Sequence, residues 1–103
     1  MLLKKGVKIK GIKPETVLGM MIAESVWKIS LGTSDPMIVT SVTDGKHMNG
    51  SLHYKGYGFD VRTNFLTSTQ KTIFFDALRN HMDLEFDIVL EKSHIHVEFD
   101  PKY

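Results

Sequence analysis

The segment 94–99 reads His-Ile-His-Val-Glu-Phe, so polar and apolar side chains alternate along it with a period of two. This alternation is typical of a β-strand with one buried face, because successive side chains point to opposite faces of a sheet. The apolar residues would face a core, whereas His94, His96 and Glu98 would share the other face. The chain must therefore build a sheet that is covered on one side. The two imidazoles could serve one metal ion or active site, or they could belong to a solvated polar face.

Two other segments predict helices. Apolar residues recur at helical spacing over residues 14–29, with Pro14 suited to the first turn and Gly32 to the end of the helix. A second helix should follow Thr67, which can form a capping box with Gln70, and should continue to about Met82. The face expected to pack in the first helix carries Leu18, Met21, Ile22, Ser25, Val26 and Ile29. The matching stripe in the second helix is Ile73, Phe74, Ala77, Leu78 and Met82.

Four segments predict strands, namely residues 37–42, 59–63, 86–90 and 94–99. Residues 43–57 are rich in turn-forming residues, which predicts a long loop of the kind that often carries function in a small domain. Helices and strands do not alternate regularly along the chain. We therefore expect an α+β fold with a small, mainly antiparallel sheet and helices packed on one face.

The composition limits the classes of function. The chain has 103 residues without a repeat or linker, which predicts one domain over residues 1–103. Its 13 basic and 12 acidic residues nearly balance, so neither nucleic acid nor a membrane is an expected partner. The first 13 residues lack the apolar run of a signal peptide, so we expect a soluble chain synthesised in the cytoplasm. Because there is no cysteine, a metal would be bound by histidine and carboxylate.

The predicted loop and the strand after it supply further candidate ligands. Gly56 and Gly58 lie between His53 and Asp60, and they would let the backbone turn so that the two side chains converge. With His96, these residues would provide three nitrogen and oxygen ligands. That is the protein share of an open catalytic zinc site with water in the fourth position. A purely structural role for the three side chains is the alternative.

The same segments resemble the motifs of a zinc-peptidase superfamily. Residues 51–60 are similar to the Ser-x-His-x-x-Gly-x-Ala-x-Asp motif of the D-alanyl-D-alanine metallopeptidases, with Gly58 in place of the alanine. The His-x-His of residues 94–96 is similar to the partner motif. The superfamily includes lysostaphin-type endopeptidases and the zinc-binding domain of hedgehog proteins, which residues 51–56 and 91–96 resemble closely. The resemblance spans roughly residues 39–99, and the ordered pair of motifs is more specific than either motif alone.

The resemblance implies a role for each matching residue. It implies His53, Asp60 and His96 as zinc ligands, with His94 beside the metal as a catalytic residue. Glu91 matches the general base of the peptidases, although its spacing from His96 is one residue shorter than in hedgehog proteins. Glu98, on the same strand face as His96, is the alternative base. The substrate-binding residues implied by the resemblance are His47 and Ser51.

The implied function is a zinc metallopeptidase that hydrolyses amide bonds in peptidoglycan. It would act on the stem peptide as a D,D-carboxypeptidase or an endopeptidase, in the manner of a compact phage endolysin. Zinc would supply an activated water at neutral pH, Glu91 would move its proton, and His94 would stabilise the oxyanion. Without an export signal, the protein would reach the cell wall after lysis or within a particle. The alternatives are a zinc-binding module without catalysis and a structural component of a larger particle.

Overall fold

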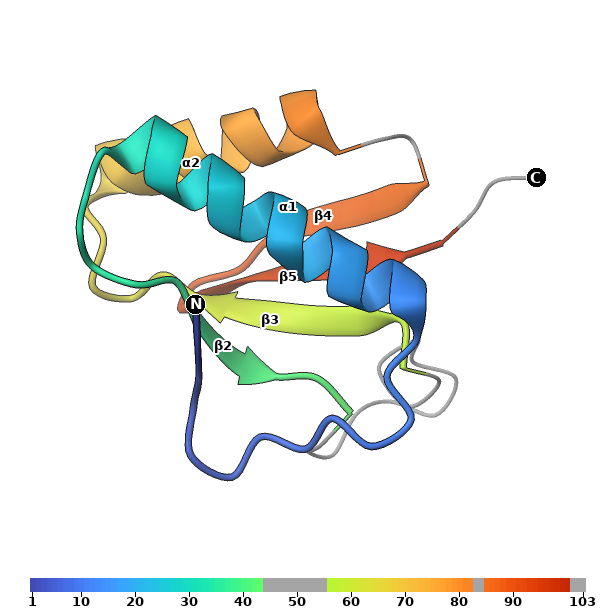
Figure 1. Ribbon diagram of the computed structural model, residues 1–103. Coiled ribbons are helices and arrows are strands. Elements are labelled where there is room, and N and C mark those ends of the chain that lie inside the picture. The colour runs from blue at the N-terminus through green and yellow to red at the C-terminus, as the bar shows by residue number, and fades with distance from the viewer. Residues whose placement is uncertain (44–55, 83–84, 101–103) are drawn as a thin grey trace.

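The computed structural model describes residues 1–43, 56–82 and 85–100. Within these residues, five strands form one mixed sheet and two helices cover one of its faces (Figure 1). The elements in chain order are β1 (Leu2–Leu3), α1 (Pro14–Leu31), β2 (Ile38–Ser41), β3 (Gly58–Arg62), α2 (Ser68–His81), β4 (Phe86–Leu90) and β5 (His94–Phe99). The predicted α+β class is confirmed.

The strands lie in the order β1-β2-β3-β5-β4. β1 runs parallel to β2, and the other three pairings are antiparallel, so the sheet is mainly antiparallel as predicted. β1 was not predicted, because two residues are too few to show a periodic pattern. It is held by the backbone N–H of Leu2, which donates to Met37 O at 2.8 Å. β5 lies between β3 and β4, and this order brings the C-terminal strand to the interior of the sheet.

The strands bury the residues that their alternation predicts. Phe59 and Val61 of β3 and Ile95 and Val97 of β5 are each at most 1% exposed, and they form the core with the helices. The intervening residues therefore point to the sheet face that the helices do not cover. Every polar residue of β3 and β5 that was predicted to form the site lies on this second face.

The predicted packing face of α1 is wrong. Leu18, Met21 and Ile29 are exposed, at 55%, 58% and 82%, and of the predicted face only Val26 is buried. The buried face instead carries Thr16, Gly19, Met20, Ala23, Val26 and Trp27. Small residues on this face let the helix approach the sheet closely, since a Cβ at Gly19 would lie 2.9 Å from a ring carbon of Phe86. The helix is apolar on both sides, so periodicity alone selected the wrong one.

α2 follows its prediction more closely. Thr67 caps the helix: its hydroxyl accepts from the backbone N–H of Gln70 at 3.1 Å, and the Gln70 side chain accepts from the Thr67 N–H at 2.9 Å. Phe74, Leu78 and Met82 of the predicted stripe are buried. The ring of Phe74 packs edge-on against Trp27 of α1, with centroids 5.0 Å apart, and this contact joins the two helices.

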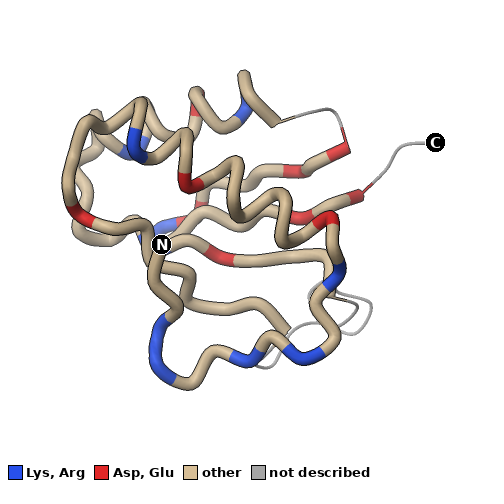
Figure 2. The backbone as a smooth tube through the Cα atoms, in the orientation of Figure 1, with Lys and Arg blue, Asp and Glu red and all other residues tan. Residues whose placement is uncertain are grey.

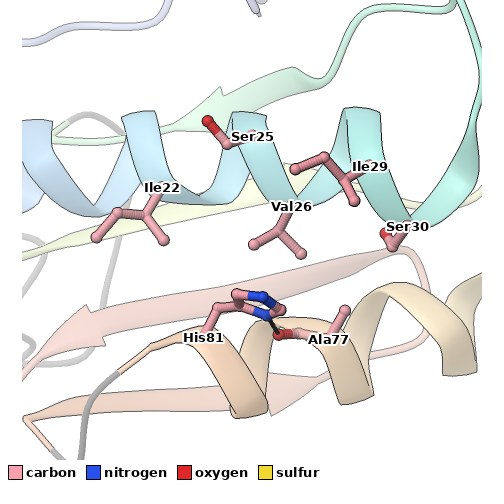
Figure 3. Close-up of a pocket in the computed structure, with 7 residues that line it drawn as sticks. All are labelled: Ile22, Ser25, Val26, Ile29, Ser30, Ala77 and His81. Carbon is pink, nitrogen blue, oxygen red and sulfur yellow. Dashed lines mark hydrogen bonds between the residues drawn. The ribbon is translucent and has the colours of Figure 1, made fainter.

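A small pocket of about 240 Å³ lies between the two helices (Figure 3). Its lining is mainly apolar and consists of Ile22, Ser25, Val26, Ile29, Ser30, Ala77 and His81. The sheet separates this pocket from the polar face of β3 and β5. None of the predicted site residues that the structure describes lines this pocket. Among the described residues, no helix is long and apolar enough to cross a membrane.

Candidate metal centre

The pairing of β3 with β5 brings the two sequence motifs together. Asp60 lies directly opposite His96 in the strand register, and Arg62 lies opposite His94. Side chains at opposed positions on one sheet face have Cβ atoms about 5 Å apart, so they can contact one another. The antiparallel register therefore assembles residues that are 36 positions apart in the chain.

Asp60 and His96, two of the residues predicted to bind a metal, contact each other. Asp60 Oδ1 lies 2.9 Å from His96 Nδ1, and the two side chains are 13% and 19% exposed. Two ligand atoms that each lie about 2.0–2.1 Å from a tetrahedral zinc ion are about 3.3 Å apart. The observed separation is close to this value, so the oxygen and nitrogen fit two positions of one zinc ion after a small outward movement.

His94 lies at the edge of this pair. Its Nε2 atom is 3.9 Å from Asp60 Oδ1, and its side chain is 31% exposed. On the other side of the ring, Nδ1 lies 3.2 Å from the hydroxyl of Ser93. His94 was predicted to stand beside the metal without binding it, and in the structure it lies beside Asp60 with its side chain partly exposed.

Glu98 lies on the opposite side of the His96 ring. Its Oε1 atom is 2.7 Å from His96 Nε2, so the imidazole is held between two carboxylates. Burial lowers the pKa of His96, but hydrogen bonds and charge attraction from Asp60 and Glu98 outweigh it and raise the pKa to about 9. The environment of this ring therefore favours a positive charge, which a proton or a metal ion can supply.

Glu91 lies in the turn between β4 and β5. Its backbone N–H donates to His94 O at 2.9 Å, which closes the turn beside that histidine. Its side chain is exposed, in contrast to the half-buried carboxylates of Asp60 and Glu98. Three predicted site residues, His47, Ser51 and His53, lie outside the described residues.

Gly56 and Gly58 differ in conformation. Gly56 has φ 83°, as the predicted turn requires, and a Cβ there would lie 2.1 Å from the carbonyl oxygen of Gly11. Gly58 was also expected to turn, but it is an extended residue of β3 opposite Glu98. The turn into the strand therefore ends before Gly58, and β3 carries Asp60 to its place beside His96.

Two acidic residues beside Glu98, Asp87 and Asp100, were not predicted from the sequence. One carboxylate oxygen from each of Asp87, Glu98 and Asp100 lies within 4.8 Å of the others, and such a group could hold a metal ion. Asp87 is the β4 neighbour of Glu98 in the register. The alternation of side chains along the strands could have predicted the position of Asp87. Once β4 pairs with β5, Asp87 lies on the same sheet face as His96.

Charges are unevenly distributed over the fold. Figure 2 shows acidic residues on β3, β4 and β5, whereas basic residues recur along the segment that precedes α1. The latter are Lys4, Lys5, Lys8, Lys10 and Lys13. The near-zero net charge of the chain therefore conceals an uneven distribution, with acidic residues concentrated on the strands that carry the candidate site.

No protein-family model matches the chain, and no curated protein matches its sequence.

Proposed function

We propose that this chain is a zinc-dependent amide hydrolase with the ion held by His53, Asp60 and His96. The observation that carries the proposal is the 2.9 Å contact between Asp60 Oδ1 and His96 Nδ1. Each residue comes from one of the two motifs, and the strand register alone places them together. A carboxylate and an imidazole at this separation, with a third ligand from His53, form the donor set of a catalytic zinc site.

The residues around the ligands support hydrolysis. When bound, zinc would lower the pKa of a water molecule to about 7, so that hydroxide would be available at neutral pH to attack an amide carbonyl. His94 is partly exposed beside Asp60, where its imidazole can donate a hydrogen bond to the oxyanion of the substrate. Glu91, in the adjoining turn, is the proposed base that receives the proton of the water and passes it to the leaving amine. His47 and Ser51 are the proposed contacts to the substrate.

The proposed substrate is the stem peptide of peptidoglycan. This choice of substrate rests on the resemblance of residues 51–60 and 94–96 to the D-alanyl-D-alanine metallopeptidase motifs. Within that superfamily the reaction is hydrolysis of a peptide bond by a carboxypeptidase or an endopeptidase. The proposed setting is the bacterial cell wall.

Mass analysis of digested cell-wall sacculi tests this proposal. The zinc-loaded protein should release stem-peptide fragments, whose masses identify the bond that is cut. Glu91→Gln should retain zinc and reduce the rate by at least about 100-fold, because it removes the general base. Glu15→Gln is the matched control, since Glu15 is an exposed glutamate at the start of α1, and it should leave the rate unchanged. Full zinc content without any released peptide would refute hydrolysis of this substrate.

A zinc-binding module without catalysis is the second candidate. The observation that favours it is that Glu98, the half-buried glutamate of the polar face, is bonded to His96, whereas Glu91 is exposed. In such a module, His53→Ala should abolish zinc binding, while neither wild type nor Glu91→Gln should cleave sacculi. If His53→Ala retains a full equivalent of zinc, the ligand set is wrong for both candidates.

A further inference from the structure

Glu98 contacts His96 at the ring nitrogen that does not face Asp60. Its Oε1 atom bonds to Nε2, whereas Asp60 Oδ1 lies at Nδ1. The two nitrogens of an imidazole point in different directions, so Glu98 lies on the side of the ring away from Asp60. A carboxylate in this place does not compete for the metal position at Nδ1.

The neighbouring positions explain why Glu98 turns along its own strand toward His96. Its partner on β3 is Gly58, which has no side chain to offer a contact. Its partner on β4 is Asp87, whose negative charge repels it. Residues two apart on one strand face are about 6.6 Å apart, which a glutamate and an imidazole can span. His96 is therefore the favourable partner on this face.

The bond at Nε2 has a consequence for metal binding. A neutral imidazole carries one proton, and the nitrogen without it can bind a metal. When Glu98 accepts a hydrogen bond from Nε2–H, the lone pair is left on Nδ1. The same bond limits rotation of the ring, and Nδ1 stays directed toward Asp60 Oδ1.

We propose that Glu98 is a positioning residue that fixes the tautomer and orientation of His96, so that Nδ1 binds zinc together with Asp60. The inference rests on the proposed zinc site and does not require that the site be catalytic. It also assigns Glu98 a role other than general base. Carboxylates that accept a hydrogen bond from a metal-bound histidine commonly change metal affinity by about 10–100-fold.

Zinc affinity of purified full-length variants, measured by competition with a chromophoric chelator at pH 7, tests the proposal. Glu98→Ala should weaken zinc binding by about 10–100-fold, because Nε2–H loses its acceptor. Glu98→Gln should restore affinity to within about threefold of wild type, since an amide oxygen accepts the same hydrogen bond. Glu98→Gln also keeps the shape of the side chain, and it therefore controls for a folding defect in the alanine variant.

Asp87→Asn is the matched control for charge. It removes one negative charge next to Glu98 but leaves the bond between Glu98 and His96, and its zinc affinity should stay within about threefold of wild type. Nitrogen-15 NMR of the zinc-loaded protein gives a second readout. In wild type and Glu98→Gln, Nε2 should be protonated and Nδ1 metal-bound.

The outcomes separate this inference from the proposed function. The inference fails if Glu98→Ala binds zinc as tightly as wild type, or if Asp87→Asn weakens binding as much as Glu98→Ala. It also fails if Nε2 of His96 is the metal-bound nitrogen. If the wild-type protein does not bind zinc, both this inference and the proposed function fail. Weakened binding in Glu98→Ala supports the inference even if wild type releases no peptide from sacculi.

Discussion

The imidazole of His96 bonds to a carboxylate through each of its nitrogens, Asp60 at Nδ1 and Glu98 at Nε2. Two negative charges beside one half-buried ring favour a positive charge between them. Without a metal, a proton on each nitrogen satisfies both carboxylates. In the proposed zinc-bound state, the ion would take the place of the proton at Nδ1, and the bond from Nε2 to Glu98 would persist. In either state, a positive charge at Nδ1 faces the negative charge of Asp60.

In metal-free protein, His96 should titrate near pH 9, above the usual value of 6.5. Because the pKa is raised in the folded state, its contribution to stability is fully present below pH 6.5 and is lost as the pH rises through about 9. NMR titration of the His96 ring and denaturant unfolding between pH 6 and 10 measure the two effects.

The double variant Asp60→Asn, Glu98→Gln is the control for this prediction. It keeps the shapes of both side chains but removes their charges, so the pKa of His96 should fall well below 9, because the charge attraction that helps to outweigh burial is lost. An unchanged pKa in the double variant would show that the two carboxylates do not cause the shift.

Among the elements, those with one apolar face were predicted well and α1 was not. β5 shows strict alternation, and the structure buries Ile95 and Val97 as that pattern requires. α1 has apolar residues all around, and the small side chains of Gly19 and Ala23 decide which side approaches the sheet. How closely α1 approaches the sheet depends on the side chains of both elements, so it cannot be predicted from the sequence of the helix alone.

The candidate site was predictable in its residues but not in its contacts. The alternation of polar and apolar residues predicted that His94, His96 and Glu98 share one strand face, and the structure confirms this. The pairing of Asp60 with His96 depends on the register between two strands that no hairpin joins, and the alternation of side chains does not distinguish registers that differ by two residues. The bond from Glu98 to His96 further depends on Gly58 as its β3 neighbour, a residue expected to form part of a turn.

The capping box of α2 can be tested by Thr67→Ala. The hydroxyl of Thr67 accepts from the Gln70 N–H at 3.1 Å, and its loss should destabilise the protein by about 1 kcal/mol. Thr69→Ala is the control, because Thr69 is an exposed threonine in the same first turn, and it should change stability by no more than about 0.5 kcal/mol. Urea unfolding measures both. Equal effects of the two substitutions would contradict a specific role for the cap.

Gly56 and Gly6 allow a test of close approach between elements. Both have positive φ, but a Cβ at Gly56 would lie 2.1 Å from Gly11 O, whereas a Cβ at Gly6 would meet nothing within 4 Å. Gly6→Ala should therefore cost about 1–2 kcal/mol from backbone conformation alone. Gly56→Ala should cost clearly more, because the segment before α1 must also move. Chemical denaturation that gives the same loss for both would exclude the steric contribution.

At the scale of the whole molecule, the sheet separates two kinds of surface. Its covered face builds the core with α1 and α2, and its other face gathers carboxylates and imidazoles from β3, β4 and β5. The acidic group of Asp87, Glu98 and Asp100 adjoins the proposed site on this second face. Like charges held close together oppose folding. A bound cation would relieve this repulsion.

Zinc at the proposed site should therefore stabilise the whole fold, since it would bind the assembled site and not the separated motifs. At a free zinc concentration of 100 times Kd, the gain in unfolding free energy is about 2.7 kcal/mol. For a domain of this size that corresponds to a rise in Tm of roughly 10–20 °C, which differential scanning calorimetry with and without a chelator measures. Asp60→Asn should lose most of the rise, because it removes one of the three ligands, while Asp87→Asn should keep it. An equal rise in Asp60→Asn and wild type would place the zinc elsewhere, with the acidic group at Asp100 as the next position to test by substitution.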